Sequence, residues 1–460
     1  MALRGIASAR PVERADEQRA RGKAARAAIP FESLGTFLPI ERSAAAILAA
    51  QESDRLAHLR PLRRERMSAS PFTFYRGSAA VMAHDLAGQD HTETHLVVCG
   101  DAHLSNFGLF ASPERQLMFD LNDFDEAAPG PWEWDVKRLV TSVVLAAEEN
   151  GLSDRAIRTA AVLTAETCRT GLRRLLGSSH LDRYYASTSL ERMSGLLPEA
   201  LRPALEKAVV KARKRTSARA IERFMSVDKQ GRDRFVESPP ILTHVPHLTE
   251  ETIQRLFDEY RLSVRPDIAL LLGQYALTDV ALRVVGVGSV GTRCYLLALT
   301  GSDGSHLLLQ IKQADASVVA QNCHPHPGAP TLVADGGDQG RRVVACQEIL
   351  QSASDPFLSH VANEGRHFYV RQFRDMKGSI DVSRLRADEL TAYGEVCAAI
   401  LARAHAQSPA APWVGGYLGK SGGADEAFAA WSVAYAAQVH RDYEAYVATP
   451  PAGAGGPGTR

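Results

Sequence analysis

The chain has 460 residues, enough for two or three domains or lobes that each bury a sizeable core. Its 53 basic and 53 acidic side chains give a formal net charge of zero, so no overall field recruits nucleic acid or an anionic membrane. It has no apolar run of the roughly 20 residues that cross a bilayer, no apolar core of a secretory signal near its start, and no paired spacing among its six cysteines. We therefore expect a cytoplasmic protein with reduced thiols and with neither a nucleic-acid nor a membrane partner.

The first part of the chain is predicted to be helical. Residues 1–40 are rich in alanine and in charges of both signs, and we expect a charged N-terminal arm, helical or disordered. Residues 41–270 are predicted to form the first part of a large lobe, with its catalytic loop and helices. Arg76, in the aromatic segment Phe72–Gly77, could contact a phosphate, but an ion pair with a neighbouring carboxylate is the more common role of such an arginine.

Residues 95–126, HLVVCGDAHLSNFGLFASPERQLMFDLNDFDE, predict three short strands separated by tight connections. Asp101 and Asn106 follow the first strand, and Asp123 follows the third. Because strand ends joined by short loops present side chains on a rigid frame, we expect these three residues to lie together. Carboxylates with an amide oxygen are hard ligands that suit Mg²⁺, and one carboxylate would remain free to orient a nucleophile.

Other roles remain open for these residues. Asp and Asn are common in turns, so Asp101 and Asp123 could merely cap strand ends. His103 follows Asp101 by two residues and could take part in proton transfer, although a lone histidine is more often a structural hydrogen-bonding group. Together with Asp120 and Asp125, the residues Asp101, His103 and Asp123 could instead form the cluster of a metal-dependent phosphohydrolase.

A small lobe is predicted from residue 271 to residue 380, built on strands around a glycine-rich hairpin. The sequence VVGVGSVG at 284–291 contains Gly286, Gly288 and Gly291, and a strand follows it, whereas a dinucleotide-binding motif requires a helix there. Backbone N–H groups of such a hairpin can approach phosphates closely. Lys312, on the second strand after the hairpin, could reach the α and β phosphates.

The remaining segments complete the two lobes. A helix predicted at 341–354 would cover Lys312, and either Gln347, which aligns with its apolar positions, or Glu348 could hold the lysine. A strand at 367–373 leads to a hinge at 373–376. The last segments are C-terminal helices that complete the large lobe at 381–448 and a disordered tail at 449–460.

These parts resemble a two-lobed, protein kinase-like α+β fold. The form Gly-Asp-x-His-x-x-Asn at 100–106 is similar to the catalytic loop of the aminoglycoside and choline kinase branch. In an ordinary kinase the glycine loop and the lysine strand precede the catalytic loop, whereas here they follow it. The resemblance therefore implies a circular permutation, in which the helix ending LARAHA at 401–406 would lie next to the strand at 95–99.

The resemblance is closer to one bacterial family, domain of unknown function 2252, which carries no agreed activity. It rests on motifs distributed from residue 40 to residue 446, which are GDAHLSNFG, FDLNDFDE, VVGVGSVGTRCY, FYVRQFRDMKGS and LARAHA.

The kinase resemblance implies ATP and Mg²⁺ as cofactors and transfer of a phosphoryl group to a hydroxyl of a small-molecule acceptor. Asp101 would orient that hydroxyl, Asn106 and Asp123 would hold Mg²⁺, and Lys312 would pair with phosphate oxygens beneath the glycine hairpin. Asp135, early in the next helix, resembles a structural aspartate of this kinase branch. The alternatives are AMP transfer, a nucleotide-binding pseudokinase that acts as a regulator and, less favoured, the phosphohydrolase.

Overall fold

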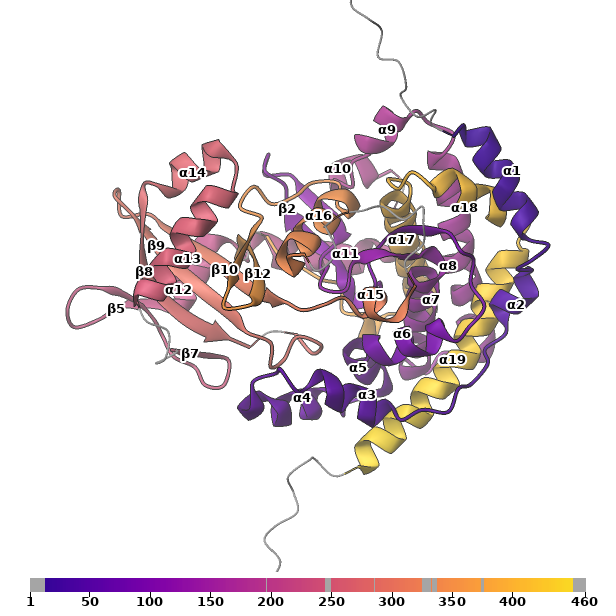
Figure 1. Cartoon of the computed structure of the whole chain (residues 1–460), viewed down its shortest axis with the longest axis horizontal. Coiled ribbons are helices and arrows are strands. Elements are labelled where there is room, and N and C mark those ends of the chain that lie inside the picture. Colours follow the sequence, from indigo (N-terminus) through magenta and orange to yellow (C-terminus); the bar gives the residue numbers. More distant parts are fainter. Residues whose placement is uncertain are drawn as a thin grey trace, which may run out of the picture.

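The computed structural model describes residues 13–195, 197–244, 250–284, 286–324, 332, 337–373 and 376–449. They form an α+β protein in which a lobe built on an antiparallel sheet lies beside a larger lobe of helices (Figure 1). The expected α+β class is therefore confirmed. Residues 1–12, the tail from residue 450 and positions 374 and 375 of the predicted hinge lie outside the described residues.

The smaller lobe contains, within the described residues, a six-stranded antiparallel sheet in the order β11-β12-β10-β9-β8-β7. The strands are β7 Leu242–His244, β8 Tyr275–Arg283, β9 Cys294–Gly301, β10 His306–Ala314, β11 Ser359–Asn363 and β12 Arg366–Gln372. Strand alternation gives β10 two different faces. Leu307 and Leu309 pack with helices α13 (Glu250–Ser263) and α14 (Pro266–Leu272), whereas Lys312 belongs to the opposite face.

That opposite face is partly covered by helix α12 (Ser217–Phe224) and by the hairpin of β5 (Met225–Val227) and β6 (Asp233–Phe235). Residues from Ser217 onward therefore pack with the sheet, although the sequence analysis placed the start of the small lobe at residue 271. The reason is that amphipathic helices show that they have an apolar face, but not which lobe that face will cover.

The larger lobe is organised around α7 (Trp132–Glu149), which is buried on nearly all sides. Helices α8 (Asp154–Leu175), α17 (Ala387–His405) and α19 (Gly423–Ala448) pack against it, and α19 runs along the outer edge of the lobe in Figure 1. Its other helical segments are α9 His180–Tyr184, α10 Leu190–Met193, η3 Glu199–Leu201, α11 Arg202–Arg213, η4 Val382–Arg384 and α18 Ala411–Leu418.

The larger lobe also contains two short antiparallel strand pairs, of which β2 and β3 form a hairpin. Strand β1 (His95–Val98) pairs with β4 (Ala128–Pro131), and β2 (Phe107–Ala111), which follows η2 (Leu104–Asn106), pairs with β3 (Leu117–Leu121). The sequence predicts β1, β2 and β3, but no strand at the Pro-Gly-Pro motif at 129–131. In the structure those residues form β4, whose position at a sheet edge tolerates proline because an edge strand needs fewer N–H donors.

The N-terminal helices pack onto the larger lobe. They are α1 Ala15–Ala25, α2 Phe31–Gly35, α3 Ala44–Gln51, η1 Ala57–Leu59, α4 Arg60–Met67, α5 Pro71–Gly77 and α6 Ala79–Ala87. Within the predicted N-terminal arm, α1 is helical and lies against α18, so closely that a Cβ on Gly22 would lie 2.0 Å from the carbonyl oxygen of Trp413. The contact is made by backbone atoms. The sequence of α1 is highly charged and has no apolar stripe from which the contact could be predicted.

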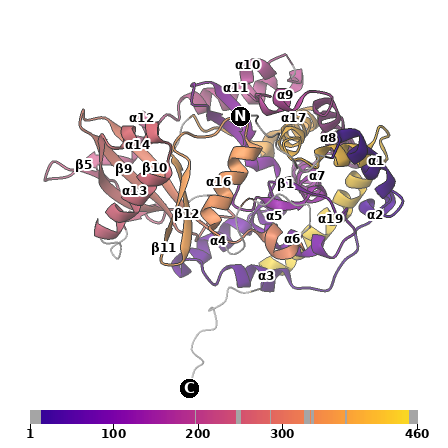
Figure 2. The ribbon, with the colours of Figure 1, turned by 45° about the horizontal axis from the view of Figure 1, so that its top comes forward.

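Helix α16 (Gln339–Leu350) lies between the two lobes (Figure 2), and the short α15 (Val318–Asn322) packs on β4 and α6. The end of α17 lies beside β1, since the Val97 N–H donates to Ser408 Oγ at 2.9 Å. Residues more than 300 positions apart therefore meet at β1, the strand that leads to Asp101.

We expect Arg42→Ala to destabilise the protein strongly. Arg42 joins the N-terminal segment to α6 and α19 by hydrogen bonds to Asp85 (2.8 Å) and Asp442 (2.7 Å), and its side chain is 6% exposed. Without the guanidinium two carboxylates remain buried and uncompensated, so the free energy of unfolding should fall by about 3–5 kcal/mol in urea denaturation. Arg265→Ala, which breaks an exposed pair, should change it by less than about 1 kcal/mol; equal effects would contradict this account.

Candidate functional site

The acidic loop after β1 is held in place by the buried carboxylate of Asp135 on α7. This carboxylate accepts hydrogen bonds from the backbone N–H groups of Cys99 (2.7 Å) and Gly100 (2.8 Å), and from His405 Nε2 of α17 (2.9 Å). Gly100 has a φ of +75°, and a Cβ there would lie 2.2 Å from the carbonyl oxygen of Glu126. The turn therefore requires glycine, and its direction is fixed by an aspartate 35 residues further along the chain.

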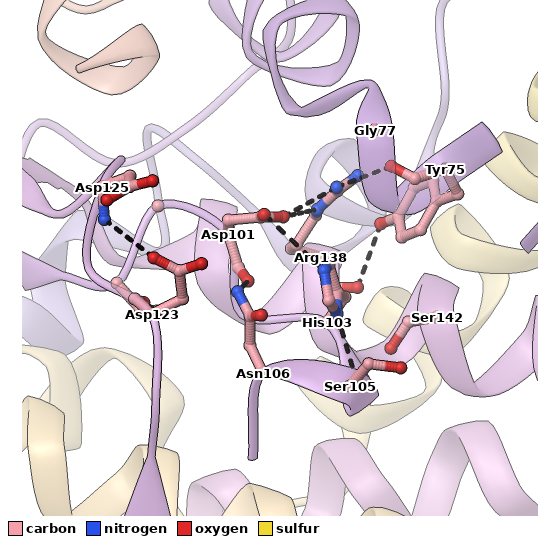
Figure 3. A network of polar contacts seen from close by, with 12 residues as sticks. Tyr75, Gly77, Asp101, His103, Ser105, Asn106, Asp123, Asp125, Arg138 and Ser142 are labelled. Atoms are coloured by element: carbon pink, nitrogen blue, oxygen red, sulfur yellow. Dashed lines mark hydrogen bonds and ion pairs between the residues drawn. The ribbon is translucent and has the colours of Figure 1, made fainter. Parts of the chain in front are cut away.

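Asp101 projects from this turn toward Arg138 and His103 (Figure 3). The Arg138 guanidinium donates to Asp101 Oδ1 at 2.8 Å, and His103 Nε2 lies 3.6 Å from Asp101 Oδ2. Burial raises the pKa of Asp101 to about 6, against the opposing effect of Arg138. With one oxygen bound by Arg138, the second oxygen is left to accept a proton.

His103 is a neutral, buried group. Burial lowers its pKa well below the usual value, and the charges of Arg76 and Arg138 act in the same direction. Its Nδ1 accepts a hydrogen bond from the Ser105 N–H, which leaves the proton on Nε2, toward Asp101. His103 can therefore orient the Asp101 carboxylate but is unsuited to carry a positive charge.

Asn106 and Asp123 offer oxygen ligands on the same side of Asp101. Asn106 Nδ2 donates to the Asp101 carbonyl at 2.7 Å, which aims the amide oxygen elsewhere, and Asp123 keeps a side chain that is 35% exposed. Among the described residues, no group of three or more His, Cys, Asp or Glu side chains is arranged to hold a metal ion. An amide and one carboxylate nevertheless fit Mg²⁺, which usually takes one or two protein ligands and completes its shell with waters and substrate phosphates.

Lys312 crosses from the sheet lobe to the acidic loop. Its Nζ lies 3.5 Å from Asp123 Oδ1 and also bonds Asp125, whose other oxygen accepts a hydrogen bond from Tyr369 (2.9 Å). Burial alone would lower the pKa of Lys312, but the two carboxylates raise it well above its usual value. Burial and the neighbouring Asp123 raise the pKa of Asp125, whereas Lys312 holds the pKa of Asp123 below its usual value despite burial.

The glycine segment at 284–291 lines the same site and contacts the N-terminal helices. Gly286 and Gly291 have φ values of +66° and +90°, which glycine adopts without strain. Their carbonyl oxygens accept hydrogen bonds from Arg66 Nη1 (2.5 Å) and from the Leu56 N–H (2.8 Å), respectively. Arg55 Nη1 donates to the neighbouring Val290 carbonyl at 2.7 Å. Val285 lies outside the described residues.

The acidic loop and the glycine segment line one cavity of about 120 Å³ between the lobes, whereas the predicted residues Lys312 and Gly291 are not among its lining residues. It brings together these predicted residues: Arg76, Asp101, His103, Asn106, Asp123, Asp125, Gly286 and Gly288. The lining of the cavity also contains residues that were not predicted from the sequence, among them Gln51, Arg55, Glu126, Gln313 and Asp315. Burial raises the pKa of Glu126 to about 7, although its Oε2 accepts a hydrogen bond from the Val318 N–H (2.7 Å).

Helix α16 does not hold Lys312 through either predicted residue. Glu348 is exposed, and Gln347 is buried but donates to Gln351 at 2.9 Å, in the lining of a separate cavity of about 230 Å³. The helix instead approaches the site through Arg342, which donates to the backbone carbonyls of Asp125 and Asp315 at 2.8 Å. An arginine bonded to distant carbonyls leaves no local pattern in the sequence.

The fold and the site define a class: two-lobed α+β proteins with an acidic loop, a glycine segment and a buried lysine around one cavity. The chain belongs to the family described as "Uncharacterized protein conserved in bacteria (DUF2252)", whose profile matches residues 55–449. No curated protein and no solved structure matches the chain. Across the described residues, no helix combines the length and apolar character needed to span a membrane.

We expect Asp135→Asn to destabilise the protein by about 1–3 kcal/mol, because one amide oxygen cannot serve three buried donors and an unsatisfied N–H remains. Urea denaturation measures the loss. The control is Asp388→Asn, since the Asp388 side chain is 60% exposed and should tolerate the change within about 0.5 kcal/mol. If the two variants were equally stable, Asp135 would not be holding the loop.

Proposed function

We propose that the protein is a phosphotransferase with a kinase-like, circularly permuted fold, which transfers the γ-phosphoryl group of ATP to a hydroxyl of a small molecule. One observation carries this proposal. The glycine segment and Lys312 converge on Asp101, Asn106 and Asp123, although Lys312 and Asp123 are 189 positions apart. The contact between the end of α17 and β1 supports the permuted order, because an ordinary kinase joins the corresponding elements directly.

The proposed roles follow from the contacts. Asp101 Oδ2 accepts the proton of the acceptor hydroxyl as its oxygen bonds to the γ-phosphorus, and the bond from that phosphorus to the bridging oxygen breaks to release ADP. Lys312 neutralises phosphate oxygens, and N–H groups of the glycine segment lie close to them. Asn106 and Asp123 would hold Mg²⁺, which would supply charge neutralisation on the phosphates.

A nucleotide-binding pseudokinase is the second candidate, because one observation favours it. Lys312 bonds Asp123 and Asp125 themselves, and α16 offers it no acidic partner among the described residues. The phosphohydrolase has less support: Asp120 is buried, and its Oδ2 accepts hydrogen bonds from Thr188 Oγ1 and the Ser352 N–H. That carboxylate is thus engaged away from the other residues of the hypothetical cluster.

The direct test incubates the full-length protein with Mg²⁺, a metabolite library and ATP labelled either on the γ-phosphate or on the α-phosphate. Phosphoryl transfer would label a metabolite from γ-labelled ATP alone, and AMP transfer would do so from α-labelled ATP alone. ATP binding without any turnover would favour the regulator. Phosphate release from phosphate esters without ATP would favour the hydrolase.

We expect Asp123→Ala to remove the dependence of ATP binding on Mg²⁺. In the wild type, calorimetry should show much weaker ATP binding when a chelator replaces Mg²⁺, because Asp123 contacts the nucleotide through the metal. In the variant, affinity should be low and equal in both conditions. Asp388→Asn is the control and should retain the wild-type difference. Equal wild-type affinity with and without Mg²⁺ would argue against the assignment of Asp123.

We expect kcat to fall as the pH is lowered through about 6. Asp101 must be ionised to accept the proton, and its ionised fraction decreases below its raised pKa of about 6. Asp101→Asn should lower kcat by about 10²–10⁴-fold and abolish this acidic limb, while Mg²⁺-dependent ATP binding remains. The measurement is a pH–rate profile at saturating substrates. A variant with the wild-type profile would show that Asp101 is only a turn residue.

A further inference from the structure

Arg76 is a cation that the protein leaves unpaired inside the candidate site. It lies at the end of α5 and lines the cavity with Asp101 and His103. Its Nε is buried without a hydrogen-bond partner, and no described residue forms an ion pair or a side-chain hydrogen bond with its guanidinium. The ion pair that the sequence analysis favoured for Arg76 is therefore not formed.

The neighbouring arginines, in contrast to Arg76, each donate hydrogen bonds to acceptors within the protein. Arg63 donates to Glu52 (2.9 Å) and to the Gly77 carbonyl (3.0 Å), Arg138 donates to Asp101, and Arg342 donates to backbone carbonyls. A guanidinium that is partly taken out of water, as that of Arg76 is, is stabilised by such acceptors, because burial without a partner is costly. The unpaired state of Arg76 thus indicates that its acceptor comes from outside the chain.

The carboxylates that line the cavity already have other partners. Asp101 is bound by Arg138, and both Asp123 and Asp125 are bound by Lys312. Glu126 accepts a hydrogen bond from the Val318 N–H, and Asp315 accepts one from Gln313 Nε2.

Arg76 lines the same cavity as Asp101, beside which the acceptor hydroxyl would bind. Its charge influences the pKa values of Asp101 and His103, whereas the pKa of Asp123 is influenced by Lys312, Arg371 and Lys377. Arg55 and Arg66 donate hydrogen bonds to carbonyl oxygens of the glycine segment, whereas Arg76 does not. Arg76 therefore shares the cavity with the proposed base, and its charge acts on Asp101 and His103.

We propose that the acceptor carries an anionic oxygen group, a phosphate or a carboxylate, near its reactive hydroxyl, and that Arg76 binds this group. The inference rests on the proposed function, because Asp101 marks the acceptor position only if it is the base. It narrows the substrate class from any small alcohol to hydroxylated small anions. A planar guanidinium suits both kinds of anion, since it donates two parallel hydrogen bonds to carboxylate or phosphate oxygens.

The test compares three probes that share a glycerol-like carbon chain: glycerol, glycerate and glycerol 3-phosphate. Full-length protein is first saturated with Mg²⁺ and the non-hydrolysable ATP analogue adenylyl imidodiphosphate, and each probe is then titrated by calorimetry. We expect at least one of the two anions to bind about 10- to 100-fold more tightly than glycerol, as charge-assisted hydrogen bonds predict. Whether glycerate or glycerol 3-phosphate binds better distinguishes a carboxylate from a phosphate as the recognised group.

Arg76→Met should abolish the preference for the anion, and Arg76→Lys should retain part of it, because lysine keeps the charge but loses the bidentate geometry. Arg386→Met is the matched control, since Arg386 is 72% exposed and should leave the preference unchanged. Unchanged affinity for the nucleotide analogue would show that each variant is folded. In the wild-type enzyme, an anion that competes with the analogue would assign Arg76 to the nucleotide and overturn the inference.

Equal binding of all three probes, or a preference that survives in Arg76→Met, would also overturn the inference. The proposed function fails in a separate way, by absence of Mg²⁺-dependent binding of the analogue before any probe is added. An Arg76-dependent anion preference without analogue binding would keep the anion site and refute the phosphotransferase.

Discussion

The buried carboxylate of Asp135 is the interaction on which the site depends. Through three hydrogen bonds it joins the central helix α7, the end of α17 and the turn that presents Asp101. The same helix contributes Arg138, which binds Asp101 one helical turn further along. One rigid element therefore fixes both the backbone and the side chain of the proposed base, which is the kind of support that a preorganised site requires.

The second constraint is that the site is built from both lobes. Lys312 comes from the sheet lobe and the acidic loop from the helical lobe, and their ion pairs cross the boundary between them. Arg342 of α16 adds hydrogen bonds to the carbonyls of Asp125 and Asp315, so the helix between the lobes touches parts of both. A shift of one lobe relative to the other would change the separation of Lys312 and Asp123, and with it the space available for a nucleotide.

The sequence predicted the parts of this site that local patterns encode. The strand ends that carry Asp101, Asn106 and Asp123, and the glycine segment with its flanking strands, depend on residues close together in the chain, and the structure contains them. Arg138 and Arg342 were missed because their partners are set by tertiary packing. Glu348 was a candidate because of its residue type, but the rotation of α16 about its axis leaves it exposed. Likewise, β4 and the close packing of α1 on α18 depend on backbone contacts that side-chain patterns do not show.

The order of the elements along the chain does not affect the assembled site, but it determines when that site can form during synthesis. Helix α7 packs against the adjoining α8 and also against α17 and α19, which lie more than 200 residues further along the chain. Until α17 and α19 have been synthesised, part of the apolar surface of α7 lacks its native cover, and Lys312 and the glycine segment, which lie between α7 and α17 in the sequence, also come after the acidic loop. The larger lobe is thus expected to mature only after α17 and α19 have left the ribosome, which makes the nascent chain a natural client for chaperones.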